Sequence, residues 1–217
     1  FSTVMFDETY SQRDGTLSRR PLGDNVFPAT TEEWVLSGPH FFVGNPFTKT
    51  PFRACSSNKA YSRIDLEEMP DDYLPRTNYR PMSDRAEYRR RVPQLSWSID
   101  EATSSTVTDS YRLVYSNYVN ISAERTTRPI IAPPGVAHIH TISSLAFASA
   151  DAMFDVAGYM ASIPCDHSVR SAGMNHLYMS QLGRVPLIED HTKLRARTLA
   201  LNCLTSHYAP LWEQVYD

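Results

Sequence analysis

The residues of this sequence best suited to binding chemistry are arginines, and they are concentrated in one short segment. From Arg76 to Arg91 the chain carries six arginines against two acidic residues, a net charge of +4, with Asn78, Tyr79 and Tyr88 among them. Arginine presents a planar set of donors that fits phosphates and guanine edges, and asparagine pairs with adenine edges. The segment is typical of a DNA-binding surface, and a charged face that is merely solvated is the alternative interpretation.

Two further groups of residues extend this basic segment into a candidate DNA-binding set. Lys59 and Arg63 lie just upstream, although the acidic stretch 65–72 offers them carboxylate partners. A second group follows the turn expected at Gly173, and Arg85 is left out because its acidic neighbours are expected to pair with it. The predicted contact residues are Lys59, Arg63, Arg76, Asn78, Arg80, Arg89, Arg90, Arg91, Asn175, His176 and Tyr178.

The motifs of several nucleotide-binding and nuclease classes are absent from this sequence. The glycine-rich turn of dinucleotide and S-adenosylmethionine folds needs glycines two positions apart, and no two of the eight glycines are that close. No lysine follows a glycine, which excludes a P-loop. A common nuclease motif places a carboxylate two residues before a lysine, where this chain has Phe47, Ser57 and His191. We therefore expect neither a cofactor nor a metal in this chain.

Two segments remain as weaker candidates for catalysis. His138 and His140 are two residues apart, so on a strand both imidazoles would share one face, but no third metal ligand has suitable spacing. Cys165 directly precedes Asp166 and His167, yet adjacent residues rarely reach nucleophile–base geometry, and a buried cysteine is the simpler interpretation. A hydrolase that uses His138 or His140 is accordingly the least favoured hypothesis.

Length and composition indicate one globular domain in a reduced, cytoplasmic compartment. The chain has 217 residues, of which 41% are hydrophobic, with a net charge of −3. Three widely spaced cysteines do not suggest a disulfide framework, and no apolar run is long enough to span a membrane. Because the first residue is Phe1, we expect a fragment of a longer protein, with residues 1–33 as a peripheral N-terminal segment.

The expected elements are of mixed type and order, which predicts an α+β fold: a mixed β-sheet packed with helices and closed by a long C-terminal helix. Strand-like patterns cover residues 34–43, 111–119, 129–132, 136–142 and 184–188. Helical patterns cover residues 84–91, 144–163, 175–182 and 191–208. The last helix is expected to bury one apolar stripe, formed by Leu194, Leu201, Leu204, Tyr208 and Leu211.

Three sets of segments, taken together, resemble the TaqI-like C-terminal specificity (target-recognition) domain of adenine-specific type II restriction–modification DNA methyltransferases. The first set comprises residues 42–47, 55–61 with 64–66, and 74–81. The second set is Glu124-Arg125-Thr126 followed by residues 130–138. The third set comprises residues 154–170, 173–175 and 182–187. The second set is the most specific, and the resemblance covers most of residues 34–210. The chain also resembles the recognition halves of type I specificity subunits, in which a helix, a strand that ends in proline and a long helix close the unit.

The resemblance implies a module that docks on double-stranded DNA and selects its target sequence without catalytic activity of its own. It implies S-adenosylmethionine and the base-flipping loop in a preceding catalytic methyltransferase domain of the same parent chain, with or without endonuclease activity. The sequence departs from the family pattern at Arg128-Pro129, where an unbroken apolar strand is expected, and at Met174-Asn175. Pro129 removes a ladder donor and suggests the edge of a sheet. The alternative is a protein-interaction module within a restriction or phage-defence complex.

Overall fold

A four-stranded antiparallel sheet, in the order β1-β10-β7-β8, forms the centre of the fold. The computed structural model describes residues 2–41, 47–97, 105–183 and 192–215. The strands of the central sheet are Ser2–Thr3 (β1), Arg112–Ser116 (β7), Pro129–Ala132 (β8) and Ile142–Ala146 (β10). Strand β8 lies at an edge and begins at Pro129, which confirms the position that the sequence suggests for this proline.

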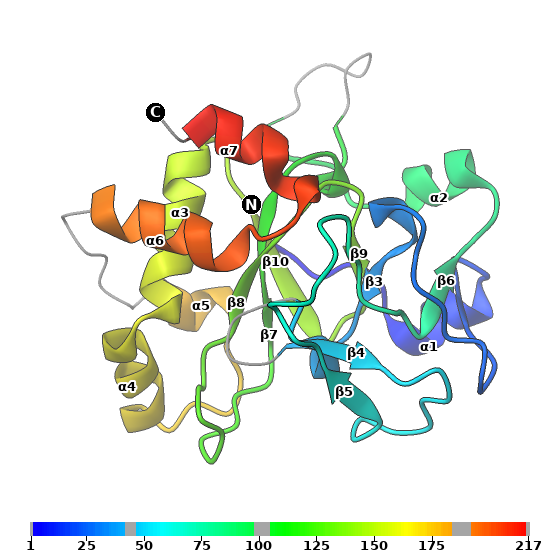
Figure 1. Ribbon diagram of the computed structural model, residues 1–217, viewed down its shortest axis with the longest axis horizontal. Coiled ribbons are helices and arrows are strands. Elements are labelled where there is room, and N and C mark those ends of the chain that lie inside the picture. Colours follow the sequence, from blue (N-terminus) through cyan, green and yellow to red (C-terminus); the bar gives the residue numbers. More distant parts are fainter. Residues whose placement is uncertain (1, 42–46, 98–104, 184–191, 216–217) are drawn as a thin grey trace.

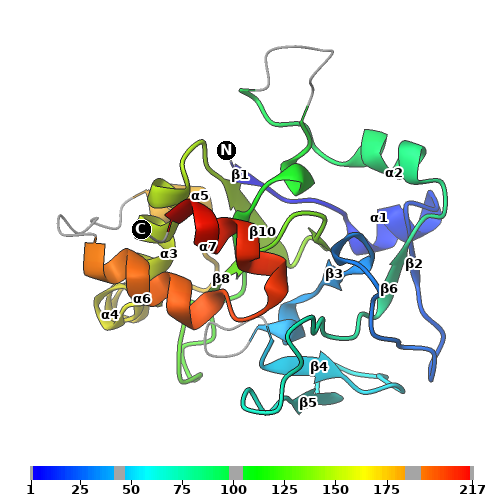
Figure 2. The same ribbon diagram turned by 45° about the horizontal axis from the view of Figure 1, so that its top comes forward.

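Three two-stranded pairings flank the central sheet on one side, and the C-terminal helices lie on the other (Figures 1 and 2). Leu17–Arg19 (β2) pairs with Tyr79–Pro81 (β6), and Lys49–Pro51 (β4) pairs with Tyr61–Arg63 (β5), both antiparallel. Val35–Leu36 (β3) pairs in parallel with Ala137–His138 (β9). Together with the helices these pairings confirm the α+β class.

The helices are short, and several begin at a capping side chain. They are Glu8–Arg13 (α1), Arg85–Arg91 (α2), Ala150–Ala161 (α3), Ile163–Ser171 (α4), Met179–Leu182 (α5), Thr192–Asn202 (α6) and Ala209–Val215 (α7), with 3-10 turns at Thr31–Glu33 (η1), Gly38–His40 (η2), Val107–Asp109 (η4) and Ser206–Tyr208 (η5). Helix α2 confirms the helix expected at 84–91, since the Asp84 carboxylate accepts a 2.9 Å hydrogen bond from the Glu87 amide. No helix among the described residues is long and apolar enough to cross a membrane.

The main hydrophobic core lies between the central sheet and helix α3. Phe154 and Ala157 of α3 are buried against Ile131 of β8 and its neighbours. Helix α6 crosses α3 at Gly158, where an added Cβ would lie 2.5 Å from the Thr198 hydroxyl oxygen. The two helices therefore pack more closely than any larger residue at position 158 would allow.

The N-terminal segment, expected to be peripheral, takes part in both the sheet and a second core. β1 pairs with β10 at the sheet edge, and β2 pairs with β6. Phe6 and Leu17 are buried with Tyr88 of α2 and with Val35 and Val107. Strands β1 and β2 and the side chains of Phe6 and Leu17 thus belong to the body of the protein, whereas most residues between β2 and η1 are exposed.

Several element boundaries differ from those that local patterns predict. The strand expected over 111–119 with one wet face is buried on both faces in β7, because helices and the smaller pairings cover both sides. The helix expected over 144–163 is wrong at its start: residues 142–146 form β10, and α3 begins after the Ser149 cap. The strand expected over residues 136–142 divides into β9 and the first residue of β10. In the strand expected over residues 34–43, only β3 is extended, and the 3-10 turn η2 follows it.

The C-terminal helix is shorter than its apolar pattern predicts. Helix α6 ends at Asn202, and the chain then turns, because the Ser206 amide donates a 2.7 Å hydrogen bond to the Asp71 carbonyl. The continuous stripe is consequently wrong: Leu201 is 68% exposed, whereas Leu211 of α7 is 1% exposed. The helix expected over 175–182 is confined to α5, and the strand expected over 184–188 lies outside the described residues.

An ion pair at the surface of α4 fixes the segment that the resemblance singles out as most specific. Asp166 accepts hydrogen bonds from the amide and hydroxyl of Thr126, the latter at 2.6 Å, and one of 2.7 Å from Arg170. The Arg170 guanidinium also donates to the carbonyls of Ile121, Ala123 and Glu124. Burial raises the pKa of Asp166, but the hydrogen bonds from Arg170 and Thr126 outweigh it and hold the pKa at about 2.

Candidate nucleic-acid interface

A polar cavity of about 450 Å³, here called the polar hollow, lies where the β4–β5 hairpin meets β6 and the end of β7. Its wall comes from separate parts of the chain, including Glu8 before β2, Asn58 and Tyr61 of the hairpin, and Tyr118 after β7. Arg128 lines it from the residue that precedes β8. The long-range pairings of the fold therefore create this cavity, and no single sequence motif does.

The floor of the hollow is a hydrogen-bonded network around Asn78. The Asn78 amide nitrogen donates a 2.8 Å hydrogen bond to the Tyr61 hydroxyl, and the Asn78 amide oxygen accepts a hydrogen bond from the Asn25 side chain. The Tyr61 hydroxyl also lies 3.2 Å from the Ser37 hydroxyl, and burial raises the pKa of Tyr61 to about 12. Both polar groups of Asn78 thus have partners inside the protein, and the side chain is only 8% exposed.

One wall of the hollow carries the Arg19–Glu8 ion pair and a tyrosine hydroxyl bonded to it. The Tyr79 hydroxyl donates a 2.6 Å hydrogen bond to the Glu8 carboxylate, and Arg19 lies 3.9 Å from the same carboxylate. Burial, followed by the Glu8 carboxylate, raises the pKa of Tyr79. Arg19 lines the hollow and its side chain is 50% exposed, so a ligand in the hollow can reach it.

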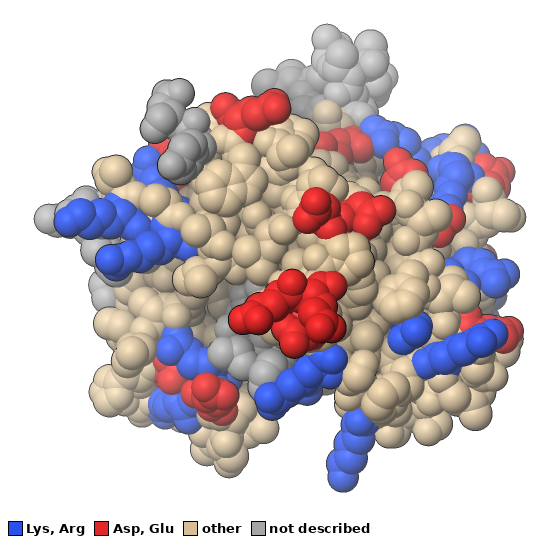
Figure 3. Space-filling model, viewed as in Figure 1, with Lys and Arg blue, Asp and Glu red and all other residues tan. Residues whose placement is uncertain are grey.

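Two of the predicted contact cations lie in the hairpin close in sequence to residues that line the hollow. Lys59 is exposed in the turn of the β4–β5 hairpin, next to Asn58, which lines the cavity. Arg63 ends β5 and is likewise exposed. In Figure 3 acidic side chains gather near the centre of the face shown, whereas lysines and arginines are spread along its lower and side margins.

An exposed aromatic group continues the rim on the side of β7. It consists of Tyr118, His176 and Tyr178, and the Tyr118 and His176 ring centroids are 5.0 Å apart. His176 stacks on Tyr178 at 5.5 Å with an interplanar angle of 2°. Backbone hydrogen bonds hold the two segments together, one from the Val119 amide to the Asn175 carbonyl. The structure therefore brings Asn175, His176 and Tyr178 to a residue that lines the hollow.

The arginines of α2 lie elsewhere and are paired within the protein. Arg89 donates 2.7 Å hydrogen bonds to both oxygens of Asp109, and both Arg90 and Arg91 pair with Glu87. Helix α2 and the β4–β5 hairpin occupy different sides of the molecule in both ribbon views (Figures 1 and 2). The structure thus separates Arg89, Arg90 and Arg91 from the predicted residues at the hollow.

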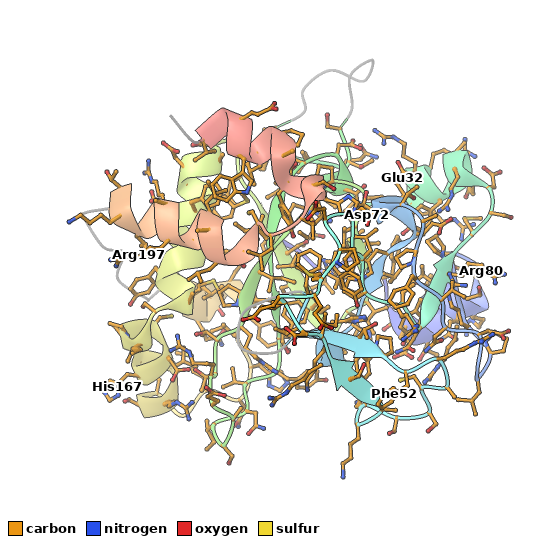
Figure 4. All side chains as sticks on the ribbon, viewed as in Figure 1. Glu32, Phe52, Asp72, Arg80, His167 and Arg197 are labelled. Carbon is orange, nitrogen blue, oxygen red and sulfur yellow. The ribbon has the colours of Figure 1, made fainter. Side chains whose placement is uncertain are left out.

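The remaining basic residues of the Arg76–Arg91 segment are also dispersed. Arg76 lies over the Phe27 ring, 4.1 Å from its centroid, and Arg80 is exposed on β6 at the edge of the view in Figure 4. Arg85 lies 3.7 Å from Glu33, not from the neighbouring acidic residues that the sequence suggests. Because β6 and α2 point these side chains in different directions, the segment does not form one continuous basic surface.

In the two weaker candidate segments for catalysis, His138 and Cys165 are buried side chains packed within the protein. His138 is fully buried, its Nε2 atom lies 2.9 Å from the Ser144 hydroxyl, and burial lowers its pKa to about 3. The Nδ1 atom of His140 accepts a hydrogen bond from the Glu8 amide. His140 therefore uses this atom within the protein, which does not favour a metal site shared with His138. Burial raises the pKa of the Cys165 thiol to about 11. Within the described ranges no group of three metal-ligating side chains is found.

Sequence reasoning missed Tyr118, Arg19 and Arg128, which line the hollow. None of the three belongs to a local charge cluster or motif that would single it out. Tyr118 meets His176 only through a bridge between segments more than fifty residues apart. Comparison of the sequence with protein-family models gave no match, and comparison with curated proteins gave none either. The residues and geometry of the hollow are therefore the features of this chain that point to a function.

Proposed function

We propose that this chain is a sequence-specific duplex DNA recognition module of a restriction–modification adenine-N6 DNA methyltransferase, with the polar hollow and its rim facing the DNA. The observation that carries the proposal is the gathering of predicted contact residues around one cavity. Lys59 follows Asn58 and Arg63 comes two residues after Tyr61, and both of these neighbours line the cavity. His176 packs against Tyr118, which also lines it, and stacks on Tyr178. These residues are separated in sequence by more than a hundred positions.

The chemistry of this rim suits nucleic acid. Lysine and arginine at the margin neutralise backbone phosphates and fix the register of the protein on the duplex. Exposed tyrosine and histidine rings supply apolar faces together with hydrogen-bonding edges, and Asn58 offers an amide at the wall. Asn78 contributes by holding the floor in place, because its own amide is already bonded to Tyr61 and Asn25.

Cations outside the hollow enter the proposal as secondary contacts. Arg80 is exposed on β6, so it could contact a phosphate without a change in the ion pairs of α2. Arg89, Arg90 and Arg91 would have to exchange their carboxylate partners for phosphates, and Arg76 would have to leave the Phe27 ring. We therefore assign them a smaller part of the binding free energy than the rim residues.

The proposal divides labour between this chain and a catalytic methyltransferase domain of the same parent. That domain would bind S-adenosylmethionine and transfer the methyl group, because this chain lacks a glycine-rich donor turn. A cytoplasmic location belongs to the proposal and agrees with the three cysteines, which are free thiols. Incubation of the chain with labelled S-adenosylmethionine and duplex DNA should transfer no label.

The test is a fluorescence-anisotropy titration of the 217-residue chain with duplexes selected from a random library, and with scrambled duplexes, over a salt series. Affinity should fall steeply with salt, since phosphate contacts release counterions, and selected duplexes should bind more tightly than scrambled ones. Replacing Lys59 and Arg63 by alanine should weaken both, whereas Arg197→Ala on the outer side of α6 (Figure 4) should not. Absence of duplex binding at low salt would leave the protein-interaction module as the better proposal.

A further inference from the structure

The segment that joins β4 to β5, residues 52–60, is here called the hairpin loop. The hairpin lies at the periphery of the fold in both ribbon views (Figures 1 and 2). All residues of the loop except Cys55 and Ala60 are exposed, and it contains Arg53 and Lys59 but no acidic residue. A two-stranded β-ribbon fits the major groove of B-DNA, whereas the minor groove, about 6 Å wide, is too narrow for it. The hairpin therefore has the shape and the charge of an element that enters the major groove.

Hydrogen bonds hold the hairpin loop in a defined conformation. The Phe52 amide donates a 2.9 Å hydrogen bond to the Ala60 carbonyl and closes the loop, and the Ala60 amide donates one of 3.0 Å to the Ser57 carbonyl. From outside the hairpin, the Asn25 side chain donates a 3.1 Å hydrogen bond to the Phe52 carbonyl. Because the loop is ordered before it meets a ligand, binding costs less conformational entropy than the ordering of a flexible loop would.

Asn58 is the residue of this loop whose side chain is suited to reading a base. It is exposed and lines the polar hollow, and its amide has no hydrogen-bond partner among the described residues. Asn25 and Asn78, in contrast, are bonded to each other. In the major groove an asparagine amide donates to N7 of adenine and accepts from its N6 amino group, a pattern that distinguishes adenine from the other bases. The unbonded amide of Asn58 has both groups available for this pairing.

We propose that the hairpin loop enters the major groove of the duplex and that Asn58 reads one adenine of the target sequence. The inference rests on the proposed function, and it names one residue that makes the binding sequence-specific. Lys59, the next residue, contacts a backbone phosphate and sets the position of the loop in the groove, since phosphate contacts position a protein and base contacts specify the sequence.

The test is a thermodynamic cycle between Asn58 and the N7 atom of adenine, measured by anisotropy titration of the 217-residue chain. Each adenine of a selected duplex is replaced in turn by 7-deazaadenine, which lacks the N7 acceptor but keeps Watson–Crick pairing. At one position the replacement should weaken wild-type binding roughly fivefold to tenfold. Asn58→Ala should weaken binding to the unmodified duplex by at least as much, and the replacement should then have little further effect.

Three comparisons support this cycle. Lys59→Ala should weaken binding to selected and scrambled duplexes about equally and should keep the response to 7-deazaadenine. Asn175→Ala removes a second exposed amide, beside the aromatic group, and should also keep that response. Asn58→Ala should have the melting temperature of the wild type, because the side chain that it removes is exposed and makes no hydrogen bond.

The outcomes separate this inference from the proposed function. If the wild type binds the selected duplex but Asn58→Ala keeps the full response to 7-deazaadenine, Asn58 does not read the adenine, while DNA recognition stands. The same holds if Asn175→Ala abolishes the response, or if no position in the wild-type complex is sensitive to the replacement. If the wild-type chain binds no duplex at low salt, the proposed function fails and the inference fails with it.

Discussion

Arg89 and Asp109 form a two-pronged ion pair, in which the guanidinium donates two hydrogen bonds of 2.7 Å to the two carboxylate oxygens. The pair joins the last turn of α2 to η4, and therefore ties the most basic stretch of the chain to the body of the protein. Neighbouring Arg91 pairs with both Glu87 and Asp14. Much of the +4 charge in this segment is thus balanced by carboxylates that the sequence places elsewhere.

Replacing Arg89 by alanine should lower the free energy of unfolding by about 1 kcal/mol or less, because the pair is largely solvent-exposed. The expected effect on the salt slope of duplex binding is smaller than that of Arg63→Ala. Urea denaturation and a salt-series titration measure the two quantities. A slope reduced by about one in Arg89→Ala, with Arg63→Ala unchanged, would place the DNA contact on α2.

Two leucines of the C-terminal region should differ sharply in their contribution to stability. Leu211 is 1% exposed, so Leu211→Ala should cost about 2–5 kcal/mol of unfolding free energy. Leu201 is 68% exposed, and Leu201→Ala should change the same quantity by about 0.5 kcal/mol or less. Chemical denaturation of both variants measures the difference. Equal losses would mean that the face of α6 carrying Leu201 is buried after all.

These two leucines also show how far local patterns reach. Apolar spacing predicts a single stripe through Leu201 and Leu211, but α6 ends where the Ser206 amide bonds the Asp71 carbonyl. That contact spans more than a hundred residues, and no local pattern encodes it. The cap at Asp84, in contrast, lies three residues from its partner amide, and the α2 helix was predicted with nearly its observed bounds.

Asp166→Asn should lower the unfolding free energy by about 2 kcal/mol, because Asp166 is only 11% exposed and loses its charge beside Arg170, although Arg170 itself is 32% exposed. Asp151→Asn is the matched control: Asp151 pairs with Arg195 at 2.7 Å but is 57% exposed, so about 1 kcal/mol or less is expected. Thermal or urea unfolding compares them. Similar losses in the two variants would contradict the burial assigned to the Asp166 pair.

The same substitution should also weaken duplex binding, because Arg170 and Asp166 fix the loop between Tyr118 and Arg128. Asp166 touches no ligand in this proposal and acts by positioning. Arg170→Lys in the otherwise wild-type chain should weaken binding less than Asp166→Asn does, since a lysine keeps a positive charge beside Asp166 but loses the carbonyl contacts. Wild-type affinity in a folded Asp166→Asn variant would show that this loop does not position the interface.

His138 should make stability depend on pH between 7 and 5. Burial, followed by the Arg112 charge, lowers its folded pKa to about 3, against about 6.5 in an unfolded chain. The unfolded state therefore takes up the proton first, so stability is fully present above pH 6.5 and is lost as the pH falls toward 3. From pH 7 to 5 the loss attributable to His138 should be roughly 1–2 kcal/mol.

Denaturation of the wild type and of His138→Asn at pH 7 and at pH 5 measures this contribution. The variant should be less stable at pH 7, because it loses the hydrogen bond to Ser144, and should lose less stability on acidification. His40, whose pKa burial also lowers, is unchanged in both proteins and cancels in the comparison. An equal loss of stability in both would show that His138 does not titrate in this way.

The candidate site was predictable in its residue types but only partly in its position. Charge and turn patterns single out Lys59, Arg63 and His176, and the structure places them next to Asn58, near Tyr61 and against Tyr118, which line the hollow. Tyr118 and Arg128 were not, because their role comes from pairings across β7, β8 and the segment before α5. Side-chain character is local, whereas the cavity is a property of the assembled fold.

Hydrogen–deuterium exchange of the 217-residue chain, free and bound to duplex DNA, tests most directly whether the polar hollow faces the DNA. Bound duplex should slow amide exchange in segments 53–63, 116–119 and 175–178, which surround the hollow. Exchange in α2 and in α6 should change little, because both helices lie away from the β4–β5 hairpin that borders the hollow (Figures 1 and 2). Protection confined to α2, or none in the three segments at saturating duplex, would contradict the account.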